Sequence, residues 1–256
     1  MRLQDKVALI TGAGQGIGAA IAGAFAAQSA AVCIAELNAD TGEAVAAALR
    51  ASGARAMAVV CDVADKASVV QAVAATITAF GRVDVLVNNA GVNVFRDPLE
   101  MSDDDWRRCL AIDLEGAMHA SRAVLPGMLE RGGGSIINIA STHAFSIIPG
   151  CFPYPVAKHA LLGLTRSLGI EYAARGVRVN AIAPGYIDTP IAEAYFATFA
   201  DPAAERRKAE NLHPPKRMGR PEEVAMTAVF LASDEAPFIN ATMIAIDGGR
   251  SVMYHD

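Results

Sequence analysis

A glycine-rich turn near the N-terminus limits the folds that are open to this chain. The apolar run 7–10 precedes Thr11-Gly12-Ala13-Gly14-Gln15-Gly16-Ile17-Gly18, and the alanine-rich stretch 19–27 follows. A strand, a glycine turn and a helix in this order let the backbone approach a pyrophosphate, and the start of the helix offers free N–H groups. The spacing differs from the usual Gly-x-Gly-x-x-Gly, but it can serve the same purpose. The turn therefore predicts a dinucleotide site, with a plain glycine-rich turn as the alternative.

An acidic residue closes the second strand that we expect. Glu36 comes 20 positions after Gly16, where a carboxylate can accept hydrogen bonds from the ribose hydroxyls of an adenosine. A 2′-phosphate would meet a like charge there, and the neighbours Leu37, Asn38 and Gln15 supply no cation. We therefore expect NAD rather than NADP, with a solvated loop acid as the other interpretation of Glu36.

Tyr154 and Lys158 lie four positions apart in a stretch of helical character, so both side chains leave the same face. A phenol with an ordinary pKa of about 10 is a weak base at neutral pH, but a nearby ammonium favours the phenolate and lowers that pKa. Tyr154 is thus a candidate general acid/base, with Lys158 tuning it. Most such pairs are ordinary neighbours on a helix surface, so this assignment depends on the other motifs.

With those motifs the chain resembles the short-chain dehydrogenase/reductase family over nearly its whole length. The motifs are Cys61-Asp62-Val63, Asn88-Asn89-Ala90-Gly91, Ser141 placed 13 positions before Tyr154, and Pro184-Gly185-Tyr186-Ile187-Asp188-Thr189. The resemblance implies that Asp62 contacts the adenine, that Ser141 binds the substrate and that Thr189 holds the nicotinamide carboxamide. The expected cofactor-binding residues are Gly12, Gln15, Gly16, Ile17, Gly18, Glu36, Asp62, Val63, Asn89, Ala90, Gly91, Tyr154, Lys158, Pro184, Gly185, Ile187 and Thr189.

One position departs from the pattern of the family. Asp113, in Ile112-Asp113-Leu114-Glu115-Gly116, stands where the family commonly has an asparagine that helps to hold a water beside the lysine. An aspartate accepts hydrogen bonds but cannot donate them as an amide does, and it brings a charge toward Lys158. It could keep the relay by pairing with Lys158 through water, or it could offset the field that lowers the Tyr154 pKa. We expect a working relay, because a side-chain oxygen suffices to bind water.

Composition limits the classes of partner. The chain of 256 residues is 53% hydrophobic and 19% charged, which fits a single domain with a large aliphatic core. Its net charge of −5 argues against nucleic acid as a partner, because proteins bind the phosphate backbone through clustered Lys and Arg. No apolar run reaches the roughly 18 residues of a membrane span, and no signal peptide is visible. We expect a cytoplasmic protein without a metal centre, because the four cysteines are scattered and form no Cys-x-x-Cys pair.

Apolar runs alternate with helical stretches, which predicts an α/β fold: a doubly wound Rossmann-type parallel sheet of seven strands with helices on both faces. The expected strands are 6–11, 31–36, 56–61, 83–88, 133–140, 177–183 and 242–247. The expected helices are 17–29, 40–52, 65–80, 102–130, 153–174 and 220–233. The resemblance implies the strand order 3-2-1-4-5-6-7. Residues 190–220 carry charges and prolines and are expected to form a mobile substrate lid.

The substrate is less sharply defined. Asn93 and His143 are candidate substrate-binding residues beside Ser141 and Tyr154, and a hydrogen-bonding pocket suits a hydroxylated compound. The stretch from Ser141 to Tyr154 resembles sugar or polyol dehydrogenases. Cys151 falls in the same stretch, although a reactive role for it is not expected.

Three functions remain open at this point. The first is an NAD-dependent dehydrogenase in which Tyr154 takes the hydroxyl proton, Ser141 holds the substrate oxygen, and Lys158 acts on Tyr154 and the nicotinamide ribose. The second is a reductase of a 3-oxoacyl thioester or another ketone. Such an enzyme would use NADPH as its cofactor, and Glu36 disfavours it. The third is a catalytically idle NAD-binding sensor, for which Asp113 is the sole support. The resemblance also implies a homotetramer.

Overall fold

A parallel sheet of seven strands forms the centre of the computed structural model, which describes residues 1–254. The strands are β1 (Val7–Thr11), β2 (Ala31–Glu36), β3 (Ala56–Val60), β4 (Val85–Asn88), β5 (Gly134–Ile139), β6 (Val177–Pro184) and β7 (Met243–Ile246). Their order is β3-β2-β1-β4-β5-β6-β7, and all neighbouring pairs are parallel. The expected fold class and strand order are confirmed.

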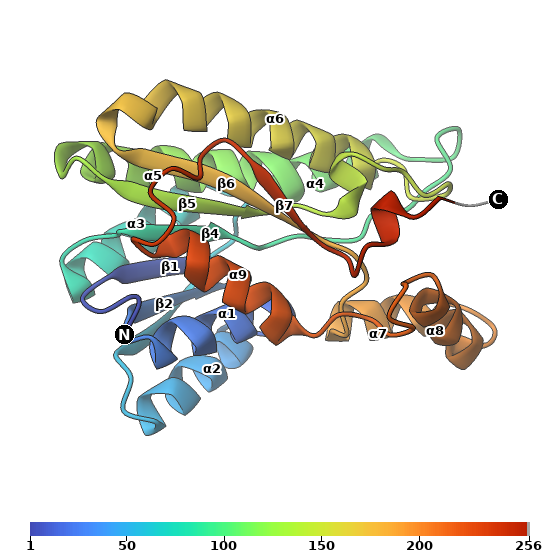
Figure 1. Ribbon diagram of the computed structural model, residues 1–256, viewed down its shortest axis with the longest axis horizontal. Helices are drawn as coiled ribbons and strands as arrows, with labels where there is room; N and C mark the ends of the chain where they lie inside the picture. The colour runs from blue at the N-terminus through green and yellow to red at the C-terminus, as the bar shows by residue number, and fades with distance from the viewer. Residues whose placement is uncertain (255–256) are drawn as a thin grey trace.

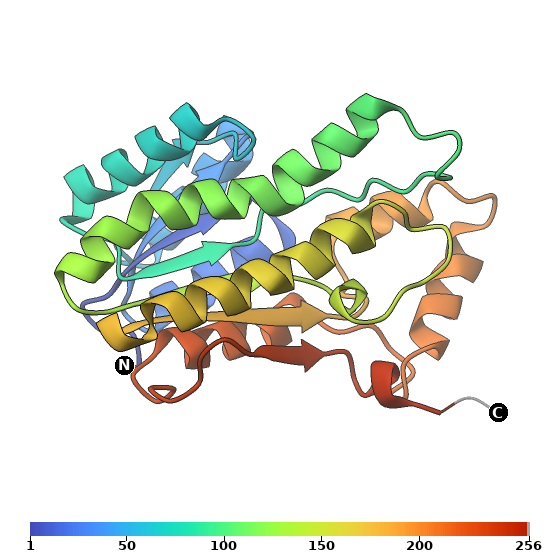
Figure 2. The same cartoon turned by 90° about the horizontal axis from the view of Figure 1, so that it is seen from above.

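Helices cover both faces of this sheet (Figure 1). On one face lie α1 (Gly16–Ala27), α2 (Ala39–Ala51) and α9 (Pro221–Ala232). On the other lie α3 (Lys66–Phe80), α4 (Asp103–Leu110), α5 (Gly116–Glu130) and α6 (Tyr154–Tyr172), as Figure 2 shows from above. Strands covered in this way need apolar side chains on both sides, which explains why β1 and β2 are nearly uninterrupted apolar runs.

The core accordingly has two main layers, one on each side of the sheet. Ile21 and Phe25 on α1 pack with Val229 on α9 in the first layer. Val73 on α3 and Met128 on α5 belong to the second. Burial of such aliphatic and aromatic side chains is the main force that holds helices and sheet together. The two layers fix the carboxyl ends of the strands, and these ends carry the site.

The expectation of one continuous helix over residues 102–130 is wrong. A π-helical turn, η1 (Ala111–Glu115), separates α4 from α5. Arg and Leu in α4 and Ala, Leu and Met in α5 favour helix, so nothing in the local sequence marked the wider turn. Such turns are frequent at functional sites, and this one carries Asp113.

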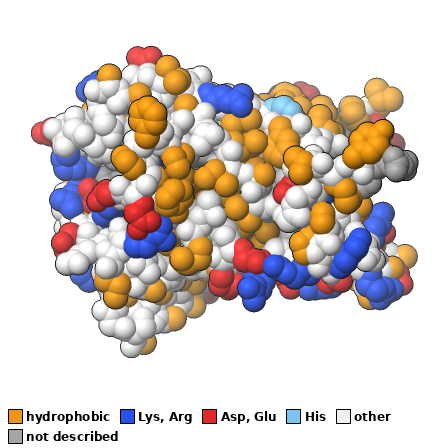
Figure 3. Space-filling model, in the orientation of Figure 1, with side chains coloured by type: hydrophobic (Ala, Val, Ile, Leu, Met, Phe, Trp, Pro, Cys, Tyr) orange, Lys and Arg blue, Asp and Glu red, His pale blue; other side chains and the backbone are white. Residues whose placement is uncertain are grey.

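The region 190–220, which is expected to form a lid, contains two short helices, α7 (Pro190–Phe196) and α8 (Pro202–Asn211), beyond the carboxyl end of β6 (Figure 1). Arg206 on α8 forms ion pairs with Asp188, Glu193 and Glu210, which connect the two helices and the preceding loop. Figure 3 shows acidic and basic side chains interspersed along this edge of the molecule. Among the described helices, none combines the length and apolar character that a bilayer crossing requires.

Candidate active site

The site begins where β1 and β4 end side by side. The Thr11 hydroxyl accepts hydrogen bonds from the backbone N–H groups of Asn89 (3.0 Å) and Ala90 (3.1 Å). The Asn89 side-chain amide donates to the carbonyl of Gly12 at 2.8 Å. These bonds join the glycine turn to the Asn-Asn-Ala-Gly stretch, so the two motifs form one wall of a crevice at the carboxyl edge of the sheet, where such folds bind their ligands.

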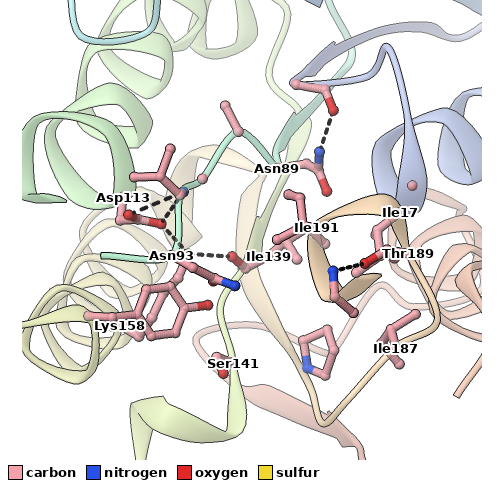
Figure 4. A pocket seen from close by; sticks show the side chains of 18 of the residues that line it. Ile17, Asn89, Asn93, Asp113, Ile139, Ser141, Lys158, Ile187, Thr189 and Ile191 are labelled. Atoms are coloured by element: carbon pink, nitrogen blue, oxygen red, sulfur yellow. Dashed lines mark hydrogen bonds and ion pairs between the residues drawn. The ribbon is translucent and has the colours of Figure 1, made fainter. Parts of the chain in front are cut away.

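A pocket with a cavity volume of about 360 Å³ runs along this edge. It brings together every site residue expected from the sequence except one. The lining includes Ser141, Tyr154, Lys158, Asp113, Asn93 and His143, together with Gly12, Gln15, Gly16, Ile17, Glu36, Asp62, Val63, Asn89, Ala90, Gly91, Pro184, Gly185, Ile187 and Thr189. Figure 4 shows how side chains from separate elements point toward the cavity.

Gly18 is the exception, and its task is packing. A Cβ at Gly18 would lie 2.4 Å from the Gly12 carbonyl oxygen, so only glycine lets α1 approach the turn. Gly12 itself has a φ of +61°, and a Cβ there would lie 2.7 Å from the Ala90 Cα. The turn therefore needs glycine for backbone conformation and for close approach, as in a dinucleotide cradle.

Glu36 lies at the end of β2 and lines the pocket beside this turn. One carboxylate oxygen accepts a hydrogen bond from the Gly14 N–H at 2.9 Å, and the other accepts from the Asn38 N–H at 3.3 Å. The carboxylate is thereby fixed at the end of the crevice where β2 ends. A fixed acid at this place suits the two hydroxyls of an unmodified ribose.

Tyr154 and Lys158 stand one turn apart at the start of α6, as the spacing predicts. The Lys158 ammonium lies 5.3 Å from the centre of the Tyr154 ring and donates to the Ile139 carbonyl at 3.3 Å. The pKa of the Tyr154 phenol is nevertheless raised above its usual value. Burial is the largest cause, and Lys158 acts in the lowering direction. Lys158 therefore acts on the Tyr154 pKa in the expected direction. The expected net lowering of this pKa is wrong, because burial outweighs the effect of the lysine.

Ser141 follows β5 and is buried at the pocket wall. Its hydroxyl accepts a hydrogen bond from the His143 N–H at 3.2 Å, which orients it at the head of a short 3-10 turn, η2 (Thr142–Ala144). The hydroxyl also acts on Tyr154, because Ser141 is among the groups that lower the Tyr154 pKa. A hydroxyl and a phenol thus flank the place where a substrate oxygen would bind.

Asp113 contacts Lys158 directly rather than through water. Its carboxylate lies 3.1 Å from the lysine ammonium, and both side chains are almost fully buried. The backbone N–H of Val92 donates to the same carboxylate at 3.3 Å (Figure 4). Burial raises the pKa of the Asp113 carboxyl, while Lys158 acts to lower it. An ion pair with a backbone donor explains how a charged aspartate is accommodated where the family commonly has an amide.

The far end of the pocket contains groups that were not expected from the sequence. Phe95 stacks edge-on against Tyr154 (5.7 Å between ring centres) and against Tyr195 of α7 (5.4 Å). Tyr186 and Arg250 also line this end. Arg250 follows the last strand, and the rule that parallel strands end at one edge could have placed it here.

The four cysteines form no disulfide bond. Cys33, Cys61, Cys109 and Cys151 are free and buried. Cys151 lines the pocket, as its place in the sequence suggested. Within residues 1–254 there is no group of three His, Cys, Asp or Glu side chains arranged to hold a metal ion.

The sheet order and the crevice place this chain in the class of dinucleotide-binding α/β proteins. Comparison with known proteins narrows the class. A family model described as enoyl-(acyl carrier protein) reductase matches residues 12–251. This match, with the relatives below, shows that the chain belongs to the short-chain dehydrogenase/reductase family of oxidoreductases.

Relatives in this family act on different compounds. The D-threitol dehydrogenase of Mycolicibacterium smegmatis is 42% identical over 251 residues, which cover 98% of this chain and 95% of the relative. The 3-oxoacyl-[acyl-carrier-protein] reductase FabG of Thermotoga maritima is 36% identical over 251 residues, covering 97% and 99%. The ligand-free structure of Thermoplasma acidophilum aldohexose dehydrogenase superposes with a TM-score of 0.91 at 34% identity, covering 99% of this chain and 97% of that one.

Proposed function

We propose that this protein is an NAD-dependent dehydrogenase that interconverts a secondary alcohol, or a sugar hemiacetal, and the corresponding carbonyl compound. The observation that carries the proposal is the meeting of Ser141, Tyr154 and Lys158 at one end of a pocket whose other end holds Glu36. The carboxylate at one end suits an adenosine ribose, and the hydroxyl groups at the other suit a substrate oxygen.

Side chains of this protein can accept and donate the proton that the reaction transfers. Ser141 holds the substrate oxygen, and Tyr154 accepts the hydroxyl proton in the oxidative direction or donates it in the reductive one. Lys158 stabilises the phenolate and offsets part of the effect of burial on its pKa. A bound nicotinamide supplies the hydride acceptor or donor. The glycine turn and Thr189 would hold this cofactor, since both line the same pocket.

Relatives support a hydroxylated substrate. One similar enzyme is named for a four-carbon polyol and one similar structure for an aldohexose. We infer a sugar, a polyol or another small hydroxylated compound, handled in the cytoplasm by a homotetramer. A ketone or 3-oxoacyl thioester reductase is the second candidate, favoured by the similarity to FabG. Glu36 weighs against the NADPH that we expect such a reductase to use.

The test is an absorbance assay of the purified protein with NAD or NADP and a panel of sugars, polyols and secondary alcohols. We expect turnover with NAD and at least tenfold lower kcat/KM with NADP, because Glu36 repels the 2′-phosphate. Tyr154→Phe is expected to bind NAD normally and to lose turnover. Tight NAD binding without turnover of any compound, including 3-oxoacyl thioesters, would instead support the idle sensor.

A further inference from the structure

The charges that line the pocket are unevenly paired. Glu36 lies at the adenosine end, and Asp62, which follows β3, is at the same end. Asp113 pairs with Lys158 at 3.1 Å. Arg250 remains at the substrate end, and within residues 1–254 no carboxylate forms an ion pair with it. Among the residues that the structure describes, a substrate that enters this end therefore meets one positive charge without an ionic partner.

The loop that carries Arg250 is held by Asp247, an acid that forms no ion pair with it. Asp247 follows β7, and its carboxylate accepts hydrogen bonds from the backbone N–H groups of Gly249 (3.0 Å) and Ser251 (2.9 Å). These bonds hold the short helical turn η4 (Arg250–Val252) beside the pocket. The Arg250 guanidinium lies over the Tyr186 ring, 5.1 Å from its centre. The aromatic face positions the cation without cancelling its charge.

A second polar group points to the same ligand. His143 is only 8% exposed, lines the pocket, and stacks edge-on against Tyr154 at 5.7 Å. Its Nδ1 has no hydrogen-bond partner in the described residues. Burial, with a smaller contribution from Arg250, lowers the pKa of His143 to about 4, so the ring is neutral at pH 7 and can donate one hydrogen bond. Buried polar atoms in proteins normally have partners, so a ligand atom is the natural partner here.

We propose that the substrate is a hydroxy carboxylate, bound through its carboxylate by Arg250 and His143 while its carbinol is held by Ser141 and Tyr154. This inference rests on the proposed function and narrows its substrate class to hydroxylated acids such as sugar acids. A planar guanidinium matches the two oxygens of a carboxylate, and the Tyr186 ring supports it from one side.

The reaction on such a substrate is balanced without any further reagent. The carbinol C–H bond breaks, and its hydride passes to NAD. The O–H proton passes to Tyr154, so that the hydroxy acid becomes an oxo acid and NAD becomes NADH. The carboxylate is unchanged, because it serves only to position the carbinol carbon.

The experiment compares polyols with the sugar acids of the same chain length, for example threitol with threonate and arabinitol with arabinonate, at saturating NAD. We expect kcat/KM at least tenfold higher for the acid of each pair. Arg250→Gln should reduce this ratio about 10- to 100-fold, the range for losing a charged hydrogen-bonding partner. Arg250→Lys should restore part of it. Arg207→Gln is the control, because Arg207 is exposed on α8 and lies outside the pocket.

Two results separate the failure of this inference from failure of the proposed function. If polyols are turned over as well as the acids, and Arg250→Gln leaves the ratio unchanged, the carboxylate subsite is wrong while the dehydrogenase assignment stands. If nothing is turned over, the subsite is tested by calorimetric binding of threonate and arabinonate to the NAD complex of Tyr154→Phe. Binding that Arg250→Gln abolishes supports the subsite, and absence of binding refutes it.

Discussion

Replacing Asp113 by asparagine tests the electrostatics of the catalytic groups most directly. The amide has nearly the same shape and can still accept the hydrogen bond from Val92, but it removes a negative charge that lies 3.1 Å from Lys158. That charge disfavours the Tyr154 phenolate, since Asp113 is among the groups that raise the Tyr154 pKa. Its removal should therefore lower this pKa and extend activity to more acidic solutions.

The distances give the size of the effect. The carboxylate lies 3.1 Å from the ammonium and the ammonium 5.3 Å from the Tyr154 ring centre, so the carboxylate is at most about 8.4 Å from that centre. At an effective dielectric constant of about 20, two unit charges at this separation interact by about 2 kcal/mol. This energy corresponds to about 1.5 pKa units.

The assay is the pH dependence of kcat/KM for alcohol oxidation, whose acidic limb reports the group that must lose a proton. In Asp113→Asn this limb should move to lower pH by about 1.5 units. Glu115→Gln is the matched control, because Glu115 is an exposed acid in the same π-helical turn. An unmoved limb would remove Asp113 from the electrostatics of Tyr154. A limb at higher pH would show that Lys158 had lost its own proton once its partner was gone, which would also refute the reasoning.

Two further predictions concern the cradle and the core. Gly12→Ala should weaken NAD binding at least tenfold by calorimetry, because the residue has a φ of +61° and its Cβ would lie 2.7 Å from the Ala90 Cα; unchanged affinity would show that the turn does not hold the cofactor. Phe25→Ala should lower the free energy of unfolding by about 3–5 kcal/mol in urea denaturation, because Phe25 on α1 is fully buried in the core layer shared with α9. A loss under 1 kcal/mol would contradict this core packing.

The fold was predictable because a parallel sheet covered on both faces requires a simple sequence pattern, in which apolar runs alternate with helical stretches. Most strands are short apolar runs, as in Ala31–Glu36, and each of the first six is followed by a helical stretch. The strand order did not follow from these patterns. It came from the family resemblance, because pairing between distant runs such as β1 and β4 depends on the whole topology rather than on local residues.

The site was predictable where a motif places a residue at the end of a strand or on one helix face. Ser141 after β5 and the pair Tyr154 and Lys158 on α6 are such cases. The direct contact of Asp113 was not, because it needs the π-helical turn and the N–H of Val92 from another segment. The net rise of the Tyr154 pKa was missed for a related reason. The lysine effect is visible in the spacing, whereas burial is a property of the assembled pocket.

The pair of Asp113 and Lys158 should also affect how the pocket attracts the proposed hydroxy carboxylate. While Asp113 neutralises Lys158, Arg250 is the uncompensated cation at the substrate end of the described pocket. Asp113→Asn exposes a second positive charge in the same cavity, so the variant should bind a hydroxy carboxylate more tightly while its affinity for the matching polyol changes little. Calorimetry with threonate and threitol on the NAD complex measures both affinities. Equal changes for the two compounds would show that the substrate end does not discriminate by charge.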